Sequence, residues 1–392
     1  MKNILITIMK DIIIDKTGWK KWRFDEFAQN ISERVEPSQT DLGVYVGLEH
    51  IDPDTLHLSR HGHPSDVEGT KLRFYKGDII FGRRRAYQRK TALATTNGIC
   101  SAHAMVLRAK QEVVDPSFFP FLFHSKQFID MAITISVGGL SPTINWKDIC
   151  KQEFLLPPKA EQKRLAELLW AADEMIEKEK KELERIEVFK KHFISLNLLN
   201  GNKYVSLKDF GSVIRGVSYK PEQVREKYDS DTFVLLRSNN IDSNFRVNYN
   251  EVYYIDSFIL KEEQHLSPND IVICMSNGSK DLVGKAAEVI SLYKERVSVG
   301  SFCAIYRPNN AIVKYLFQSS EYRSQIALLL SGSNINNLKP IDIESIKFRI
   351  QDREDMKKVI LRLELIDKVI GRIIQQLRES KLLKQELINQ IF

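Results

Sequence analysis

The side chains best suited to bind an anionic ligand are concentrated between Lys71 and Lys90, in the segment KLRFYKGDIIFGRRRAYQRK. Eight of its residues are basic and Asp78 is the only acid. Guanidinium groups bind phosphate bidentately, pair with O6 and N7 of guanine, and stack on aromatic rings. A strand over 78–81 should turn at Gly82 and present the basic and aromatic residues that follow. The segment predicts a nucleic-acid contact, with a solvated basic loop as the alternative, and its candidate residues are Lys71, Arg73, Arg83, Arg84, Arg85, Tyr87, Arg89 and Lys90.

Three further polar tracts follow turns and are candidates for the same role. The tract 274–280, which continues to Lys285, holds the equivalent position in the second half of the chain. Its Asn and Ser residues either contact DNA or simply build a turn. The tracts 141–146 and 333–337 either contact DNA or cap the helix that begins nearby. The candidate residues in these tracts are Thr143, Asn145, Ser276, Asn277, Ser279, Lys280, Lys285, Asn334 and Asn336.

The sequence contains none of the short motifs that mark a reaction centre. We find no [DN]-P-P-[YF] tetrapeptide for amino-methylation, no glycine-rich cofactor loop and no H-E-x-x-H motif. The segment 278–286 fails as a phosphate loop, because Ser279 stands where the first Gly belongs and Ala286 replaces Ser or Thr. We therefore expect no catalytic residue and no bound cofactor in this chain.

A group of histidines raises the question of a metal site. Their spacing matches no known ligand pattern, so polar loop residues near DNA are the favoured interpretation and no metal is expected. The group consists of His50, His57, His61 and His63, with Asp52 and Asp54 between them.

Size and composition define the class of protein. A chain of 392 residues predicts two to three domains, and 43% apolar with 28% charged residues is typical of soluble globular proteins. The net charge of +7 favours an anionic partner. The four cysteines are far apart, as expected of buried thiols in a reducing, cytoplasmic compartment. No apolar run is long enough to span a membrane, and residues 1–18 are expected to be an N-terminal extension without the features of a signal peptide.

The element that must position the candidate residues is one long helix within 156–200. Pro157 and Pro158 suit a helix entrance, and the next Gly or Pro is Gly201. Apolar residues recur at steps of four and three, which is the seam of a coiled coil about 50 Å long. The seam residues are Leu165, Leu169, Ala172, Ile176, Leu183, Ile186 and Phe193, interrupted by Glu179 and Lys190.

A second helix, within 350–392, has the same rhythm and is the expected antiparallel partner. Asp367 corresponds to Asp173, and Lys384 to Lys190, each 194 positions later. Two unrelated helices, each packed on its own domain, are the alternative. The seam residues here are Val359, Leu363, Ile366, Ile370, Ile373, Leu377 and Leu387.

The globular segments 19–155 and 201–349 repeat one order of elements. The strand-like run 44–48 parallels 233–236, and 149–154 parallels 343–348, while the residues between such anchors diverge. Helices are expected over 117–124 and 126–135. The predicted fold class is α+β, with two similar α/β-mixed domains separated by two long antiparallel coiled-coil helices in a pseudo-two-fold repeat. Since the major groove of B-DNA repeats every 34–36 Å or so, such a rod could hold two readers about one helical turn apart.

This plan resembles the DNA-specificity subunit of type I restriction–modification systems over about residues 19–392. The resemblance rests on the repeated arrangement and on the segments LPPKAEQKRLAELLWAADEMIE, GLEHID, FGRRRAYQRKTALA and SVGGLSPTINW. The second copy departs from it at 350–355, where IQDRED replaces the LPPKAE of 156–161.

The resemblance implies two target-recognition domains, 19–155 and 201–349, that read the two halves of a split site in double-stranded DNA. The helices of 156–200 and 350–392 would set the gap and bind two methyltransferase subunits. Those subunits would carry S-adenosylmethionine and methylate adenine N6. Motor–nuclease subunits, using ATP and Mg²⁺, would join them for restriction. None of this chemistry is expected in the present chain.

Two other classes of function are open. A coiled-coil scaffold with two protein-binding heads would have no role on DNA, but it gives no reason for the basic segment 71–90. A nuclease or methyltransferase acting alone would need the motifs that the sequence lacks.

Overall fold

The computed structural model describes residues 6–7, 9, 12–242, 244–331, 336–352 and 356–392. The chain forms two compact units, unit 1 with residues 1–182 and 373–392, and unit 2 with residues 183–372. The boundary falls inside both long helices, α6 (Lys159–Asn197) and α10 (Met356–Ile391). The predicted domain limits are not tested by this division and stay predictions.

Unit 1 is built on two four-stranded sheets. The first, in the order β2-β9-β6-β7, is antiparallel throughout and consists of Ala28–Ile31, Met105–Ala109, Ile79–Phe81 and Thr91–Leu93. The second, in the order β3-β5-β8-β4, consists of Arg34–Val35, Lys71–Phe74, Gly98–Cys100 and Tyr45–Val46, and its β4–β8 pair is parallel. A separate pair, β1 (Lys20–Arg23) with β10 (Glu153–Leu156), leads into α6.

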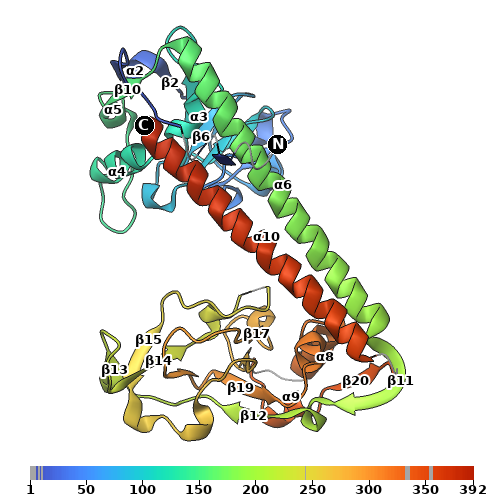
Figure 1. Ribbon diagram of the computed structural model, residues 1–392. Helices are drawn as coiled ribbons and strands as arrows, with labels where there is room; N and C mark the ends of the chain where they lie inside the picture. The colour runs from blue at the N-terminus through green and yellow to red at the C-terminus, as the bar shows by residue number, and fades with distance from the viewer. Residues whose placement is uncertain (1–5, 8, 10–11, 243, 332–335, 353–355) are drawn as a thin grey trace. The chain divides into compact units, whose positions relative to one another are not determined.

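Short helices fill the remainder of unit 1 (Figure 1). They are α2 (Phe24–Phe27), α3 (Phe119–Leu122), α4 (Lys126–Thr134) and α5 (Trp146–Ile149). The predicted helices over 117–124 and 126–135 are present in shorter form, as α3 and α4.

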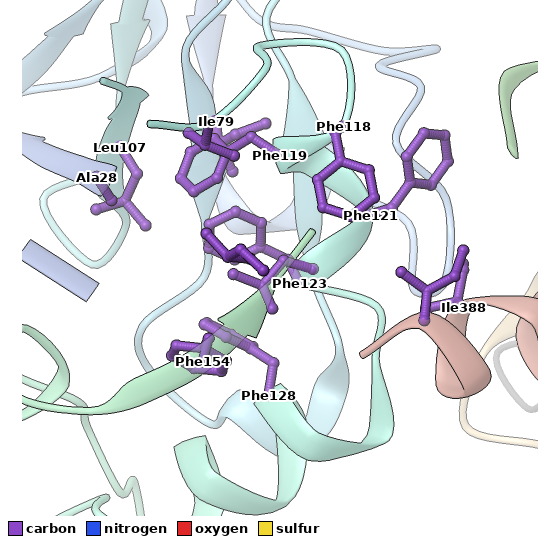
Figure 2. Close-up of a cluster of buried hydrophobic side chains, with 14 of the residues drawn as sticks. Ala28, Ile79, Leu107, Phe118, Phe119, Phe121, Phe123, Phe128, Phe154 and Ile388 are labelled. Carbon is purple, nitrogen blue, oxygen red and sulfur yellow. The ribbon is translucent and has the colours of Figure 1, made fainter. Parts of the chain in front are cut away.

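Aromatic packing holds these elements together. Phe123 lies with its ring centroid 4.7 Å from that of Phe128 and 5.0 Å from that of Phe119, both edge-on. Such geometry stabilises a core by about 0.5–1.5 kcal/mol per pair beyond the area it buries. Figure 2 shows that Ile388 of α10 reaches the same cluster as the phenylalanines. The core of unit 1 is therefore completed by the last turns of the chain.

Unit 2 repeats the first sheet, and its second sheet again contains one parallel pair of strands. Its antiparallel sheet has the order β12-β19-β16-β17, which matches β2-β9-β6-β7, and consists of Gly211–Arg215, Cys303–Pro308, Ile271–Cys274 and Ala286–Glu288. Its other sheet has the order β13-β15-β14-β18 and consists of Val224–Arg225, Tyr253–Asp256, Thr232–Leu236 and Val297–Val299. β14 lies between β15 and β18, and its counterpart by sequence, β4, lies between β8 and Gly62, with which Tyr45 exchanges two backbone hydrogen bonds of 2.9 Å.

The remaining elements of unit 2 parallel those of unit 1 (Figure 1). The pair β11 (Leu199–Ser206) with β20 (Lys347–Ile350) corresponds to β1 with β10. The helices are α7 (Val313–Phe317), α8 (Ser320–Ser331) and α9 (Pro340–Glu344).

The same buried Asp–Arg pair braces the first sheet of each unit. Arg108 on β9 donates to both carboxylate oxygens of Asp78, at 2.7 and 2.9 Å, and Arg307 on β19 does the same to Asp270, at 3.0 and 2.8 Å. Each aspartate also closes the turn before its strand, because its Oδ2 accepts from the backbone N–H three residues earlier. The starts of β6 and β16 are thus held in the same way, one strand length before each candidate loop begins.

The proline-rich entrance of α6 is explained by hydrogen bonds of Gln162. Its side chain is buried, accepts from the N–H of Asp115 at 2.7 Å and donates to the carbonyls of Val113 and Pro157 at 3.0 and 2.9 Å. Glu161 accepts from the indole N–H of Trp19 at 3.2 Å. The Pro-Pro-x-x-Glu-Gln motif therefore fixes the start of the long helix to its globular domain.

The two long helices pack together within each unit. In unit 1 the first half of α6 contributes Leu165 and Leu169, and the last turns of α10 contribute Leu387 and Ile391, to one core. In unit 2 the end of α6, with Ile194 and Leu198, shares a core with Val359 and Leu363 from the start of α10. The predicted antiparallel pairing is confirmed in each unit.

An ion pair joins α6 to α10 in each unit, with the helices exchanging roles. Both lysines and Asp173 are buried, and Asp367 is half-buried. In unit 1 Lys384 of α10 binds Asp173 of α6, and in unit 2 Lys190 of α6 binds Asp367 of α10. Each ammonium also lies over an aromatic ring, 5.7 Å from the centroid of Phe121 for Lys384 and 5.4 Å from that of Tyr315 for Lys190. The 194-residue repeat seen in the sequence thus places equivalent residues in equivalent contacts.

In unit 1 the surroundings of the ion pair favour the charged state of the acid. Burial acts to raise the pKa of Asp173, but hydrogen bonds from His57 and the charge of Lys384 outweigh it and lower that pKa to about 2. In unit 2, burial lowers the pKa of Lys190 although the charge of Asp367 opposes the shift. At neutral pH unit 1 therefore holds a carboxylate that needs its cation.

We predict that Lys384→Met lowers the stability of unit 1 by about 3 kcal/mol, because it leaves a buried carboxylate with only His57 beside it. The double variant Asp173→Leu/Lys384→Met removes both charges and should regain most of the loss. All four tryptophans of the chain, at 19, 22, 146 and 170, lie in unit 1, so their fluorescence during urea denaturation reports this unit. Equal losses in the single and double variants would contradict the prediction.

A second prediction concerns acid stability. Burial lowers the pKa of His124 to about 3, so between pH 6.5 and 3 the unfolded chain takes up a proton that folded unit 1 refuses. Stability should fall over this window as pH falls, by at most about 1.4 kcal/mol per pH unit from this residue. His124→Gln should flatten the dependence, measured by tryptophan fluorescence in urea at a series of pH values. Parallel curves for the two proteins would show that His124 contributes nothing.

Candidate nucleic-acid interface

The basic loop of unit 1 connects β6 to β7 and has a fixed backbone. Its ends are joined by a hydrogen bond of 2.9 Å from the N–H of Gly82 to the carbonyl of Lys90. The short 3-10 helix η4 (Ala86–Gln88) lies between them, flanked by Arg85 and Arg89 with φ of 57° and 54°. Non-glycine residues in this left-handed region are uncommon and cluster at functional sites. The loop therefore has a defined backbone conformation, which determines the directions of its side chains.

The structure places this loop against the tract 137–145. The N–H of Arg85 donates to the carbonyl of Pro142 at 2.8 Å, and the N–H of Ile144 donates to the carbonyl of Arg83 at 3.0 Å. Thr143 forms a β-bridge with Arg84. Two candidate segments that are about 60 residues apart in sequence are thus one continuous surface feature.

Asn145 occupies the N-cap position of α5, one of the alternatives open from sequence. Its side chain makes no cap hydrogen bond to the helix. Its backbone carbonyl instead accepts from the N–H groups of Asp148 and Ile149, at 3.1 and 3.2 Å. The amide group of Asn145 is consequently not used by the helix that it begins.

The side chains of the loop divide into outward and inward groups. Arg85 is exposed and donates through Nε to the hydroxyl of Ser141 at 3.2 Å, and Tyr87 is 52% exposed. Arg84 lies 3.4 Å from Nε2 of His103, a residue that no sequence motif marks because it follows a different strand. The side chains of Arg84, Arg85 and Tyr87 are the best placed to meet a ligand from solvent.

Arg83 turns instead toward a pocket of about 350 Å³ in unit 1. Arg34 and Lys71 also line it, together with Trp146, and none of the described residues around it is acidic. Arg34 is on β3 and was missed by sequence reasoning, because β-pairing with β5 alone brings it beside Lys71. The pocket extends the positive surface of the loop inward.

Four of the predicted contact residues already have partners within unit 1. Lys71 donates to the carbonyls of Glu68 and Gly69, and Arg73 pairs with Glu33 at 3.5 Å. Lys90 donates to the carbonyl of Leu48 at 2.6 Å. Arg89 binds Asp54 and also donates to the carbonyl of His124 at 3.1 Å and to Gln385 of α10 at 3.3 Å. The loop is thereby anchored to the long helix through its last arginine.

Unit 2 brings together the equivalent segments. Ser276 forms a β-bridge with Asn337, as Arg84 does with Thr143. Asn277 donates to the hydroxyl of Ser238 at 3.2 Å, and Asn336 donates to the carbonyl of Gly278 at 3.2 Å. Asn277 therefore helps to shape the turn, which was the alternative to DNA contact for its tract, and Asn336 bonds to the same turn.

The other candidates of unit 2 are less engaged. Ser279 and Lys280 are exposed at the start of a 3-10 helix, and Lys285 is half-buried directly before β17. Asn334 lies outside the described residues. Among the described residues, unit 2 thus offers a less basic surface at this position than unit 1.

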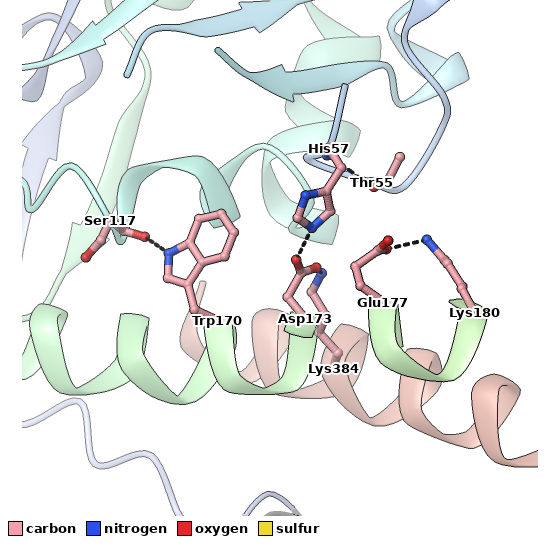
Figure 3. A network of polar contacts seen from close by, with 8 residues as sticks. All are labelled: Thr55, His57, Ser117, Trp170, Asp173, Glu177, Lys180 and Lys384. Atoms are coloured by element: carbon pink, nitrogen blue, oxygen red, sulfur yellow. Dashed lines mark hydrogen bonds and ion pairs between the residues drawn. The ribbon is translucent and has the colours of Figure 1, made fainter. Parts of the chain in front are cut away.

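The histidine group disperses in the structure. His57 lies with Nε2 2.5 Å from Oδ2 of Asp173, so it joins the ion pair that links the two long helices (Figure 3). The hydrogen bond to Asp173 raises the pKa of His57. Nearby, Trp170 of α6 donates to the carbonyl of Ser117 at 2.8 Å. Over the part of the chain that the structure describes, no three His, Cys, Asp or Glu side chains are grouped to hold a metal ion.

Burial determines the reactivity of two of the cysteines. Burial raises the pKa of Cys100 to about 12 and that of Cys274 to about 11, so both are unreactive thiols near neutral pH.

Among the residues with described positions, no helix is both long and apolar enough to cross a bilayer.

Comparison with known proteins identifies a domain that this surface resembles. Residues 65–188 match the type I restriction modification DNA specificity domain. The matched segment runs from before β5 into α6 and contains both the basic loop and the tract that pairs with it. This part of the chain is therefore similar to that domain.

Among curated proteins, the chain is similar to the specificity subunit of the type I restriction enzyme EcoKI from Escherichia coli (strain K12). The two are 36% identical over 159 residues, which are 40% of this chain and 34% of that subunit. The chain thus matches about a third of the length of such curated relatives.

Two solved structures share the fold. A chain from a structural study of complex assembly and conformational transition of the type I R-M system has a TM-score of 0.53 at 18% identity, covering 96% of this chain and 97% of its own. The S subunit of the type I restriction–modification system from M. genitalium has a TM-score of 0.52 at 14% identity, covering 97% and 98%. The predicted fold class is confirmed by this likeness.

We predict that two arginines of the basic loop differ in their contribution to stability. Arg89→Ala should lower the midpoint of tryptophan-monitored urea unfolding, because it removes contacts to Asp54, His124 and Gln385. Arg84→Ala, the control, should leave the midpoint unchanged. An unchanged midpoint in Arg89→Ala would mean that this side chain is not a structural anchor and is available to a ligand.

Proposed function

We propose that this chain is the DNA-specificity subunit of a type I restriction–modification complex. Each unit would read one half of a split site in double-stranded DNA. The proposal rests chiefly on one observation, the meeting of two diverged loops at the same place in both units, Arg84 with Thr143 and Ser276 with Asn337. Repeated scaffolds with different loop residues suit two readers with different targets.

The chemistry of the first unit supports DNA as the ligand. Arg84, Arg85 and Tyr87 supply donors and an aromatic face at the surface, and Arg83 and Lys71 add positive charge around the adjacent pocket. Guanidinium groups serve both phosphate binding and guanine readout. The family match covers this loop and gives independent support.

The chain would act by placement. Two methyltransferase subunits would bind its long helices, and each would hold its active site near one adenine. S-adenosylmethionine would be bound by those subunits, and ATP and Mg²⁺ would be used by motor–nuclease subunits. The present chain would supply no catalytic residue and no cofactor site.

A coiled-coil scaffold that binds only proteins is the second candidate, and the two predict different salt dependence. DNA binding releases counterions, so affinity should fall steeply between low and physiological salt. The test is a gel-shift titration of the full chain with a random-sequence duplex library at several salt concentrations. A chain that binds no duplex at low salt would exclude the proposed function.

We predict that Arg83→Ala/Arg84→Ala/Arg85→Ala weakens DNA binding by about 3–6 kcal/mol and reduces the salt slope by about 1 for each phosphate that is no longer bound. The preference for particular bases should be lost in one half of the selected site and persist in the other, because the variant leaves the second unit unchanged. Selection of duplexes from a random library by each protein measures both effects. Loss of preference in both halves would contradict the assignment of one half-site to each unit.

The matched control is Lys178→Ala, which removes an exposed lysine from α6 that is paired with Glu174 at 3.7 Å. It reduces the net charge of the protein without touching either candidate loop. Its DNA affinity and salt slope should remain those of the unaltered chain. If Lys178→Ala lost as much DNA affinity for its one charge as the triple variant loses for each of its three, DNA binding would depend only on the total charge of the protein.

A further inference from the structure

The loop between α4 and α5 carries an apolar tip that none of the described residues of unit 1 covers. Leu140 is 96% exposed, and Val137 in the same loop is 60% exposed. Figure 1 shows this loop extending from the end of α4. A single exposed aliphatic side chain is ordinary on a protein surface, but here two stand together at the end of a projecting loop, next to the candidate basic residues.

The tip is held in place from both sides. Val137 and Thr143 exchange two backbone hydrogen bonds, of 3.0 and 2.9 Å, that close the loop at its base. Gly138 has φ of 114°, a conformation that permits the tight turn before Leu140. The direction of Leu140 is therefore set by the backbone and does not depend on contacts of its own side chain.

Positive charge lies directly beside this apolar tip. Arg85 is bonded to Ser141, the residue after Leu140, and its N–H binds the carbonyl of Pro142. Arg84 is bridged to Thr143. A duplex whose phosphates meet these guanidinium groups would therefore lie beside the loop that carries Leu140.

We propose that Leu140 is an intercalating side chain that enters between two base pairs and unstacks one step of the DNA. This inference rests on the proposed function and deepens it. Proteins that deform DNA use aliphatic or aromatic wedges of this kind, flanked by basic residues. A base must leave the stack before its exocyclic amine can be modified, so a loosened step would lower the cost of extrusion for a partner enzyme.

The test uses the full chain and a duplex that the unaltered protein selects from a random library. 2-Aminopurine, whose fluorescence rises when it is unstacked, replaces each adenine of that duplex in turn. We expect the unaltered chain to raise the fluorescence at one step. Leu140→Ala should abolish this rise while keeping the salt slope of binding, because an aliphatic side chain neutralises no phosphate. Leu140→Met should retain the rise.

The matched control is Leu382→Ala, which removes another exposed leucine of unit 1, on α10 and 55% exposed. It should behave like the unaltered chain. A chain that selects no duplex would contradict the proposed function itself. Selection of a duplex without any rise, or the same rise with Leu140→Ala, would overturn the wedge alone. Weaker binding to a protein partner with unaltered fluorescence would likewise overturn it and assign Leu140 to a protein interface.

Discussion

The arrangement of each unit depends on an Asp–Lys ion pair whose lysine is buried beneath an aromatic ring. Removing two charges from water is costly, and the cost is recovered only when carboxylate and ammonium meet at close range. Asp173 with Lys384, and Asp367 with Lys190, satisfy this condition across the two long helices. A one-residue slip of either helix would separate the charges. The pairs therefore specify the register that an apolar seam alone would leave loosely defined.

The register in turn fixes the globular parts. In unit 1 the last turns of α10 complete a core whose other members come from residues preceding Asp173, and Arg89 reaches Gln385 on the same helix. The basic loop is thus braced by a segment almost 300 residues away in sequence. The position of the candidate surface follows from helix pairing as much as from its own strands.

Much of the fold could be predicted because its signals are periodic. The four-three spacing of the apolar residues identifies both long helices, and the shared 194-residue offset predicts that Asp173, Lys190, Asp367 and Lys384 are equivalent. The strand β6 is short, apolar and bounded by turn residues, so it too is evident. The strand order of the second sheet in each unit could not be predicted, since two- or three-residue strands such as β4 carry too little pattern.

The candidate site was predictable in composition but not in geometry. Residue type alone marks the arginines of the basic loop. It does not distinguish Arg84 and Arg85, at the surface, from Arg89, whose donors are occupied by Asp54 and His124. His103 and Arg34 come to the site through strand pairing, a long-range effect that no local pattern encodes. Leu140 was overlooked because an apolar residue in a loop usually signals burial.

The unit boundary, which lies inside both long helices, has a consequence for how such chains can recombine. Every sheet is contained within one unit, and the chain passes between the units only through α6 and α10. A crossover inside a globular segment would join parts of two sheets whose residues have diverged, whereas a crossover within α6 or α10 would transfer each sheet whole. New combinations of the two units are therefore expected to arise at the helices, and a designer wishing to join units from different chains should cut there.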